Sequence, residues 1–180
     1  MKKSSIAVAM MLAMGVTAAQ AAETGTLNFS GNVTTTACSI DAASLNTAVN
    51  FGTLAKDNIL SLPAVGDTNA QLTKPFTIKL ADCPADTPIS VKFEGGSYYD
   101  AGIQGFRDNK TLRQANVAAM IFDAETSAKV TPNEFVSKGV ATAGVNDLRY
   151  NISLTKWWTG GNTTADGDFS MAINYTMSYQ

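Results

Sequence analysis

The sequence predicts an all-β protein built as a single β-sandwich. Apolar residues alternate with polar ones at a period of two in most segments after residue 21, and the intervening stretches are rich in Gly, Asn, Asp, Thr and Pro. After residue 21, no 11-residue window carries a convincing amphipathic helical stripe. Seven or so short strands separated by turns favour a sandwich over a doubly wound sheet.

The expected strands follow one another along the whole chain. Each is a short alternating segment bounded by turn-forming residues. They are centred on residues 27–33, 49–51, 72–80, 89–93, 117–121, 148–154 and 169–179. Residues 55–70 and 96–115 separate these segments and are expected to be surface loops or to hold short helices. There is no internal repeat, low-complexity tract or linker, so one domain is expected.

The first 21 residues have the features of a secretory signal peptide. Lys2 and Lys3 precede an apolar stretch over residues 6–16, and Ala19 and Ala21 fit the small residues of a cleavage site. The alternative is a membrane anchor, but the apolar run is well short of the roughly 20 residues that a spanning helix needs. We expect a mature chain of residues 22–180, with no later segment apolar enough to span a bilayer.

Charge and composition exclude several functions. The formal net charge of −2 argues against nucleic acid or anionic lipid as a partner. Histidine is absent, so Ser–His and Cys–His nucleophile pairs are excluded. Neither an enzyme nor a cofactor is therefore expected.

The two cysteines are Cys38 and Cys83. A disulfide is the default for a cysteine pair in an exported chain. A metal site is the competing interpretation, but two thiols without histidine cannot complete a tetrahedral zinc shell unless carboxylates join them. We predict a disulfide and no metal.

Both ends of the expected sandwich offer strands for pairing with another chain. The first alternating segment begins a few residues after the predicted cleavage site. The last alternating segment runs to the end of the sequence without an internal charge or Pro. An exposed strand of this kind invites another chain to pair with it unless a partner covers it.

Three groups of residues resemble the pilin subunits of the chaperone–usher pathway, of the type 1 fimbrial kind. The stretch Gly25–Val33, followed by Ala37 and Cys38, resembles the N-terminal extension and first strand of that family. The spacing from Cys38 to Cys83 resembles the family's single disulfide. Gly167 is the fourteenth residue from the end and Tyr179 is penultimate, which resembles the family's C-terminal motif.

The resemblance implies an incomplete immunoglobulin-like β-sandwich that lacks its seventh and final strand. A donor strand from a periplasmic chaperone, and later from another subunit, would complete it, with an outer-membrane usher as a further partner. It implies three parts, a signal peptide over 1–21, a donor extension over 22–34 and a pilin domain over 35–180. The implied donor face comprises Leu27, Phe29, Gly31 and Val33, and the implied acceptor strand, which also contacts the chaperone, carries Gly167, Phe169, Met171, Ile173, Tyr175, Met177 and Tyr179.

The implied function is that of a structural subunit of a surface fimbria, exported through the periplasm, which polymerises by donor-strand exchange and supports cell adhesion. One alternative is a minor adaptor or a tip-proximal subunit that binds a host glycan. Tip adhesins of this pathway look like two-domain chains without a donor extension, whereas one domain is expected here. A periplasmic enzyme on a sandwich scaffold is the third hypothesis, and the absence of histidine counts against it.

Overall fold

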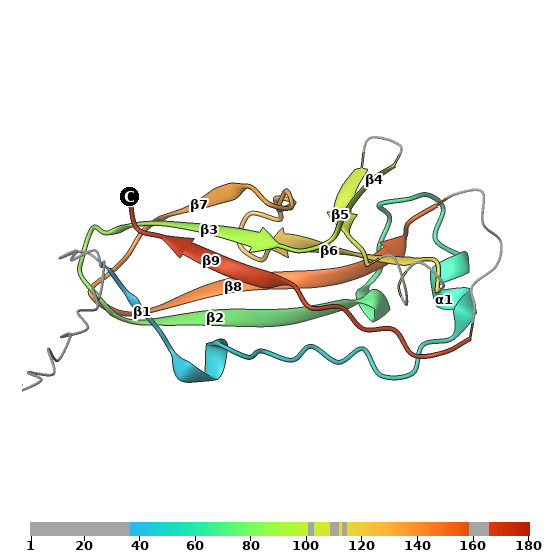
Figure 1. The fold of residues 1–180 in the computed structure, drawn as a ribbon, viewed down its shortest axis with the longest axis horizontal. Helices are drawn as coiled ribbons and strands as arrows, with labels where there is room; N and C mark the ends of the chain where they lie inside the picture. The colour runs from blue at the N-terminus through green and yellow to red at the C-terminus, as the bar shows by residue number, and fades with distance from the viewer. Residues whose placement is uncertain (1–36, 101–102, 109–111, 113–114, 159–165) are drawn as a thin grey trace, which may run out of the picture. The chain divides into compact units, whose positions relative to one another are not determined.

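Antiparallel β-strands are the main regular secondary structure in the part of the chain that the structure describes (Figure 1). The structure is a computed structural model, and it describes residues 37–100, 103–108, 112, 115–158 and 166–180. All of these belong to one unit, Thr34–Gln180. The strands are β1 Ser39–Ile40, β2 Thr73–Cys83, β3 Pro88–Glu94, β4 Ser97–Asp100, β5 Ile103–Phe106, β6 Val117–Asp123, β7 Phe135–Val140, β8 Gly144–Lys156 and β9 Asn174–Ser178. Short helices are η1 Ala42–Ser44, α1 Lys56–Leu60 and η2 Ala70–Leu72.

The larger sheet has six strands in the order β1-β2-β8-β6-β5-β4. Its centre is the long pairing of β2 with β8, in which Phe76 lies opposite Tyr150. This ladder is irregular between Leu80 and Cys83, where β2 also ends its pairing with β1. The short strand β1 forms one edge of the sheet, and only Ser39 and Ile40 pair there.

The smaller sheet has three strands in the order β7-β3-β9. Strand β3 lies at its centre, with Val91 opposite Met177 of β9 and Phe93 opposite Tyr175. Strand β9 therefore forms one edge of this sheet, and among the described residues only β3 pairs with it. In the described part of the chain its outer edge has no ladder partner, so its N–H and C=O groups are placed to pair with a further strand.

The core lies between the two sheets, as the layers in Figure 1 show. Inward residues of β3 (Ile89, Val91 and Phe93) are at most 2% exposed, while the residues between them are more accessible. The Phe93 ring packs edge-on against Tyr150, with centroids 5.0 Å apart, and against Phe76 at 6.0 Å. These edge-to-face contacts add to the burial of large apolar rings and hold the sheets together. The fold is thus the incomplete immunoglobulin-like sandwich that the resemblance implied.

Some strands of the structure differ from those expected from the sequence. Strands β4 and β5 form a hairpin inside the stretch expected to be a loop, and β7 was not expected at all. Strand β7 is not predicted from the sequence because Lys138 stands at an inward position and Gly139 follows it. These two residues interrupt the alternation of apolar and polar residues. The segment 49–51, expected to be a strand, has no strand pairing. The last strand begins at Asn174 rather than near Phe169, because its partner β3 ends at Glu94, opposite Asn174.

The predicted signal peptide and donor extension lie outside the described residues. In the part of the chain that is described, no helix has the length and apolarity needed to cross a membrane.

Candidate functional site

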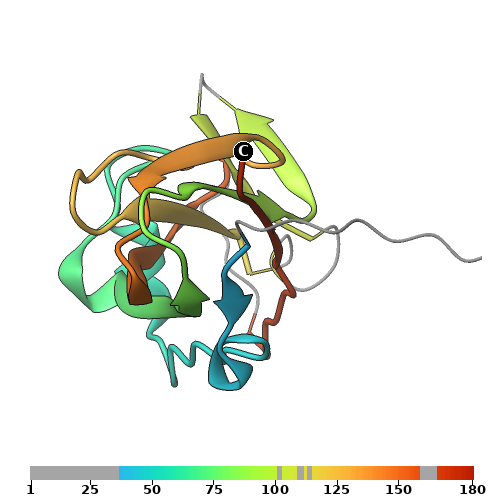
Figure 2. The ribbon, with the colours of Figure 1, turned by 90° about the vertical axis from the view of Figure 1, so that its left-hand side faces the viewer.

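An apolar groove of about 620 Å³ opens beside the C-terminal segment. One wall is the chain from Phe169 to Tyr175, which leads into β9. The other wall runs from Ile40 of β1 to Phe51. Figure 1 shows these two segments, coloured red and blue-green, and Figure 2 shows them from the side. The groove therefore lies where the edge of the small sheet approaches the β1 edge of the large one.

The C-terminal wall presents one apolar face. Phe169, Met171, Ile173 and Tyr175 are half-buried and pack against the core, while the residues between them are exposed. This alternation is that of an extended strand. Residues 169–173 nevertheless pair with no strand among the described residues, so their backbone groups border the groove without a ladder partner.

The opposite wall is held in place by a short helix. The Asp41 side chain caps η1 by accepting a hydrogen bond from the Ala43 amide at 2.9 Å. Ser44 is buried, and its hydroxyl accepts a hydrogen bond from the Lys79 amide of β2 at 2.9 Å. The next residue, Leu45, is 57% exposed. Such an exposed leucine at the rim of an apolar groove enlarges the surface that a partner strand could cover.

The floor of the groove belongs to the core of the sandwich. Phe76 and Ile78 contribute from β2, Phe93 from β3, and Ile121 and Leu154 from β6 and β8. All five side chains are apolar, so the groove favours apolar groups in whatever it contacts.

Tyr175 lines the groove at its β9 end, and Tyr179 lies beyond that end. The Tyr175 hydroxyl donates a hydrogen bond to the Ser44 carbonyl at 2.9 Å and so connects the two walls. The Tyr179 hydroxyl is buried and has no hydrogen-bond partner among the described residues. Burial raises the pKa of both phenols, and nearby Tyr175 raises the pKa of Tyr179 further. Both phenols are therefore neutral at physiological pH.

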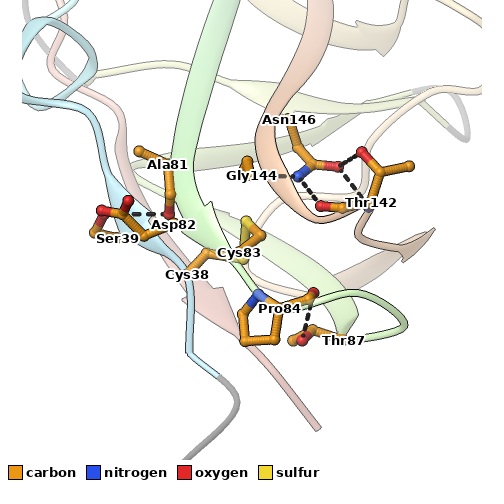
Figure 3. The surroundings of a disulfide bond; sticks show 10 residues. All are labelled: Cys38, Ser39, Ala81, Asp82, Cys83, Pro84, Thr87, Thr142, Gly144 and Asn146. Carbon is orange, nitrogen blue, oxygen red and sulfur yellow. Dashed lines mark hydrogen bonds between the residues drawn. A yellow bond between two sulfur atoms is a disulfide. The ribbon is translucent and has the colours of Figure 1, made fainter.

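The predicted disulfide is confirmed between Cys38 and Cys83, whose Cα atoms are 4.3 Å apart (Figure 3). It attaches the start of β1 to the end of β2. Beside it, the Ser39 hydroxyl donates to the Asp82 carboxylate at 3.1 Å. Because β1 has only two paired residues, this cross-link is an important covalent attachment of β1 to β2, just before the groove wall that begins at Ile40.

The structure brings most of the predicted acceptor residues together. Four of them, Phe169, Met171, Ile173 and Tyr175, line the groove. Met177 and Tyr179 lie beyond its end and pack on the core. Gly167 is exposed and does not line the groove; its φ of +136° lies in the region that favours glycine. The predicted donor residues Leu27, Phe29, Gly31 and Val33 lie outside the described residues.

The opposite wall was not predicted as part of the site. Ile40, Leu45, Val49 and Phe51 are its apolar members. The apolar pair Val49 and Phe51 was visible in the sequence as a strand-like segment, and this alternation was the one available signal. Its role depends on tertiary placement against Phe169–Tyr175, which no local pattern encodes.

The chain is similar to fimbrial proteins in both a family comparison and a comparison with single proteins. The family model described as fimbrial protein matches residues 27–180. The type-1 fimbrial protein A chain of Escherichia coli is 30% identical over 94% of this chain and 97% of its own length. Long polar fimbria protein A of Salmonella typhimurium is 30% identical over 100% of this chain and 98% of its own length.

Two solved structures share the fold. The P pilus rod subunit PapA superposes with a TM-score of 0.63 at 19% identity, covering 79% of this chain and 99% of its own. A chain of a chaperone–usher pilus gives a TM-score of 0.64 at 20% identity, covering 88% of this chain and 96% of its own. At these identities the likeness concerns the fold.

Proposed function

From the premise that this chain belongs to the fimbrial protein family, and is a structural pilus subunit and not an enzyme, we propose that it polymerises by donor-strand exchange. In this proposal the extension 22–34 of one copy fills the groove of the next. The observation that supports it best is the apolar groove beside a free strand edge. Pairing of an extended segment with such an edge is β-augmentation.

The proposed donor matches the chemistry of the groove. Leu27, Phe29 and Val33 recur at a period of two, so they share one face of an extended strand. Full burial of each such side chain contributes roughly 1.5–3 kcal/mol. Gly31 shares that face and suits a position where the donor backbone approaches the groove wall closely. Thr26 and Asn28 on the other face remain toward solvent.

The proposed contact is heterologous, since the donor of one copy meets the groove of another. A head-to-tail contact that does not close into a ring produces an open filament. Each added copy brings a fresh donor and a fresh groove, so growth continues in one direction. This geometry is what a fimbrial shaft requires.

The apolar groove also favours a role for assembly partners. An apolar groove with an adjacent free edge would drive aggregation if it stayed open during export. A periplasmic chaperone that lends its own strand would protect the groove until an outer-membrane usher passes the subunit to the fibre. The proposed location is therefore the cell surface, reached through the periplasm.

Paired charge substitutions in the extension test the proposal. Leu27→Asp with Phe29→Asp would place two carboxylates on the face that enters the groove, where unpaired charge is costly to bury. We expect cells that produce this variant to carry no fibres, by electron microscopy. Thr26→Asp with Asn28→Asp is the matched control on the solvent face and should preserve fibres. Equal loss of fibres in both variants would refute the predicted donor face.

A further inference from the structure

A buried charged pair joins the two sheets on the side of the β6–β7 connection. Lys138 of β7 forms an ion pair with Asp123 at the end of β6. Their side chains are 6% and 9% exposed, respectively. Strand β7 belongs to the small sheet and β6 to the large one, so this pair connects the layers across the core.

The two oxygens of Asp123 have different surroundings. Its Oδ1 accepts hydrogen bonds from the Glu125 and Thr126 amides, both at 2.9 Å. Its Oδ2 contacts the Lys138 amine. One oxygen is thus held by two backbone donors in the manner of an oxyanion hole, while the other faces a nucleophile.

Two further groups complete the arrangement. The Tyr150 ring lies 5.2 Å from Lys138 Nζ and shields the amine from solvent on that side. The Glu125 carboxylate lies 3.9 Å from the same nitrogen, and its side chain is 64% exposed. Glu125 can therefore exchange protons between the amine and water.

We propose that Lys138 and Asp123 join covalently, through an isopeptide bond that forms spontaneously in the folded chain. The Lys138 amine would attack Cγ of Asp123, with the negative charge on Oδ1 held by the two backbone amides. The Nζ–Cγ bond forms and the Cγ–Oδ2 bond breaks, and Oδ2 leaves as water with two protons that come from the ammonium group. The nitrogen keeps one hydrogen, and the reaction needs neither an oxidant nor a co-reactant.

The pair begins as ions, so the reaction needs a proton transfer first. Burial raises the pKa of Asp123, but the hydrogen bonds from Lys138, Thr126 and Glu125 outweigh it and lower the pKa to about 2. Transfer of one proton from Nζ to Oδ2 gives the neutral amine and neutral acid from which the attack proceeds, and the lowered pKa of Asp123 makes this state rare. Because the groups stay in contact for the life of the folded protein, one slow event suffices.

Intact mass measurement tests the bond directly. The mature chain, purified from fibres, denatured and reduced, should weigh one water molecule less than its sequence. Trypsin should then release a branched peptide in which residues 114–129 are joined to residues 130–149, with no cleavage after Lys138. A mass equal to that of the sequence, with separate peptides and cleavage after Lys138, would overturn the proposal and leave an ordinary ion pair.

Variants identify the source of the lost water. Lys138→Arg keeps the positive charge without a primary amine and should restore the full mass, whereas the exposed Lys129→Arg should not. Loss of water from a succinimide at Asp166 would persist in Lys138→Arg and disappear on hydroxylamine treatment, a pattern that would also overturn the bond. Glu125→Gln should slow the appearance of the lighter mass in a pulse-labelled sample; an unchanged rate would exclude Glu125 as the proton carrier. If the Lys138→Arg protein does not accumulate in cells, the presence or absence of the branched peptide in the wild-type chain still shows whether the bond has formed.

Discussion

Removal of the Cys38–Cys83 disulfide gives a prediction whose size follows from the structure. The bridge spans 45 residues of sequence, and loop-closure entropy for a cross-link of this span amounts to about 4 kcal/mol at room temperature. Both cysteines are nearly buried, at 8% and 4% exposure, so alanine fits each position without adding a polar group to the core. We expect Cys38→Ala with Cys83→Ala to lower the free energy of unfolding by about that amount.

Urea unfolding followed by tryptophan fluorescence measures the loss. The matched control is Ser39→Ala, which removes the hydrogen bonds to Ala81 and Asp82 beside the bridge but keeps the cross-link. Those bonds are exposed, so the control should lose less than about 1 kcal/mol. A loss of similar size in the double alanine variant would refute the claim that the bridge stabilises the fold by closing this long loop.

Three further substitutions test the groove and the core. Tyr175→Phe removes the hydrogen bond to the Ser44 carbonyl and should lower the free energy of unfolding by about 1 kcal/mol, measured by urea titration. Ile173→Asp places a charge among the apolar groove residues and should abolish incorporation into fibres, whereas the apolar replacement Ile173→Val should preserve it; equal incorporation of the two variants would count against the groove. Phe93→Ala empties the centre of the aromatic cluster and should cost roughly 3–5 kcal/mol in thermal or urea unfolding, and a cost below about 1 kcal/mol would contradict its central place in the core.

The alternating pattern of the C-terminal segment predicted its buried face correctly. Phe169, Met171, Ile173, Tyr175 and Met177 are all partly buried against the core, because side chains of an extended chain alternate whether or not the backbone is paired. The length of the strand was less predictable. Pairing depends on how far β3 runs beside the segment, and β3 ends at a Gly95–Gly96 turn that lies far away in the sequence.

The remaining features depend on contacts that are distant in sequence. The wall around Leu45 is held beside the groove by hydrogen bonds that Ser44 makes with Lys79 of β2 and with Tyr175. Strand β7 was hidden by an inward lysine, since a charge at a core position breaks the apolar alternation on which strand prediction depends. The same lysine is explained once Asp123 is found beside it in the fold. The alternation of apolar and polar residues, which predicts most of the other strands, therefore cannot reveal a strand that carries a buried, paired charge.

Production of the full chain together with a variant lacking residues 22–33 tests the central claim most directly. Such a variant keeps its groove but has no donor strand, so it can be joined to a neighbour but cannot donate to the next copy. Donor-strand exchange predicts that fibres shorten as the fraction of the variant rises. It also predicts that an epitope tag on the variant appears at one fibre end only. Fibres of normal length with the tag along the whole shaft would contradict donor-strand exchange.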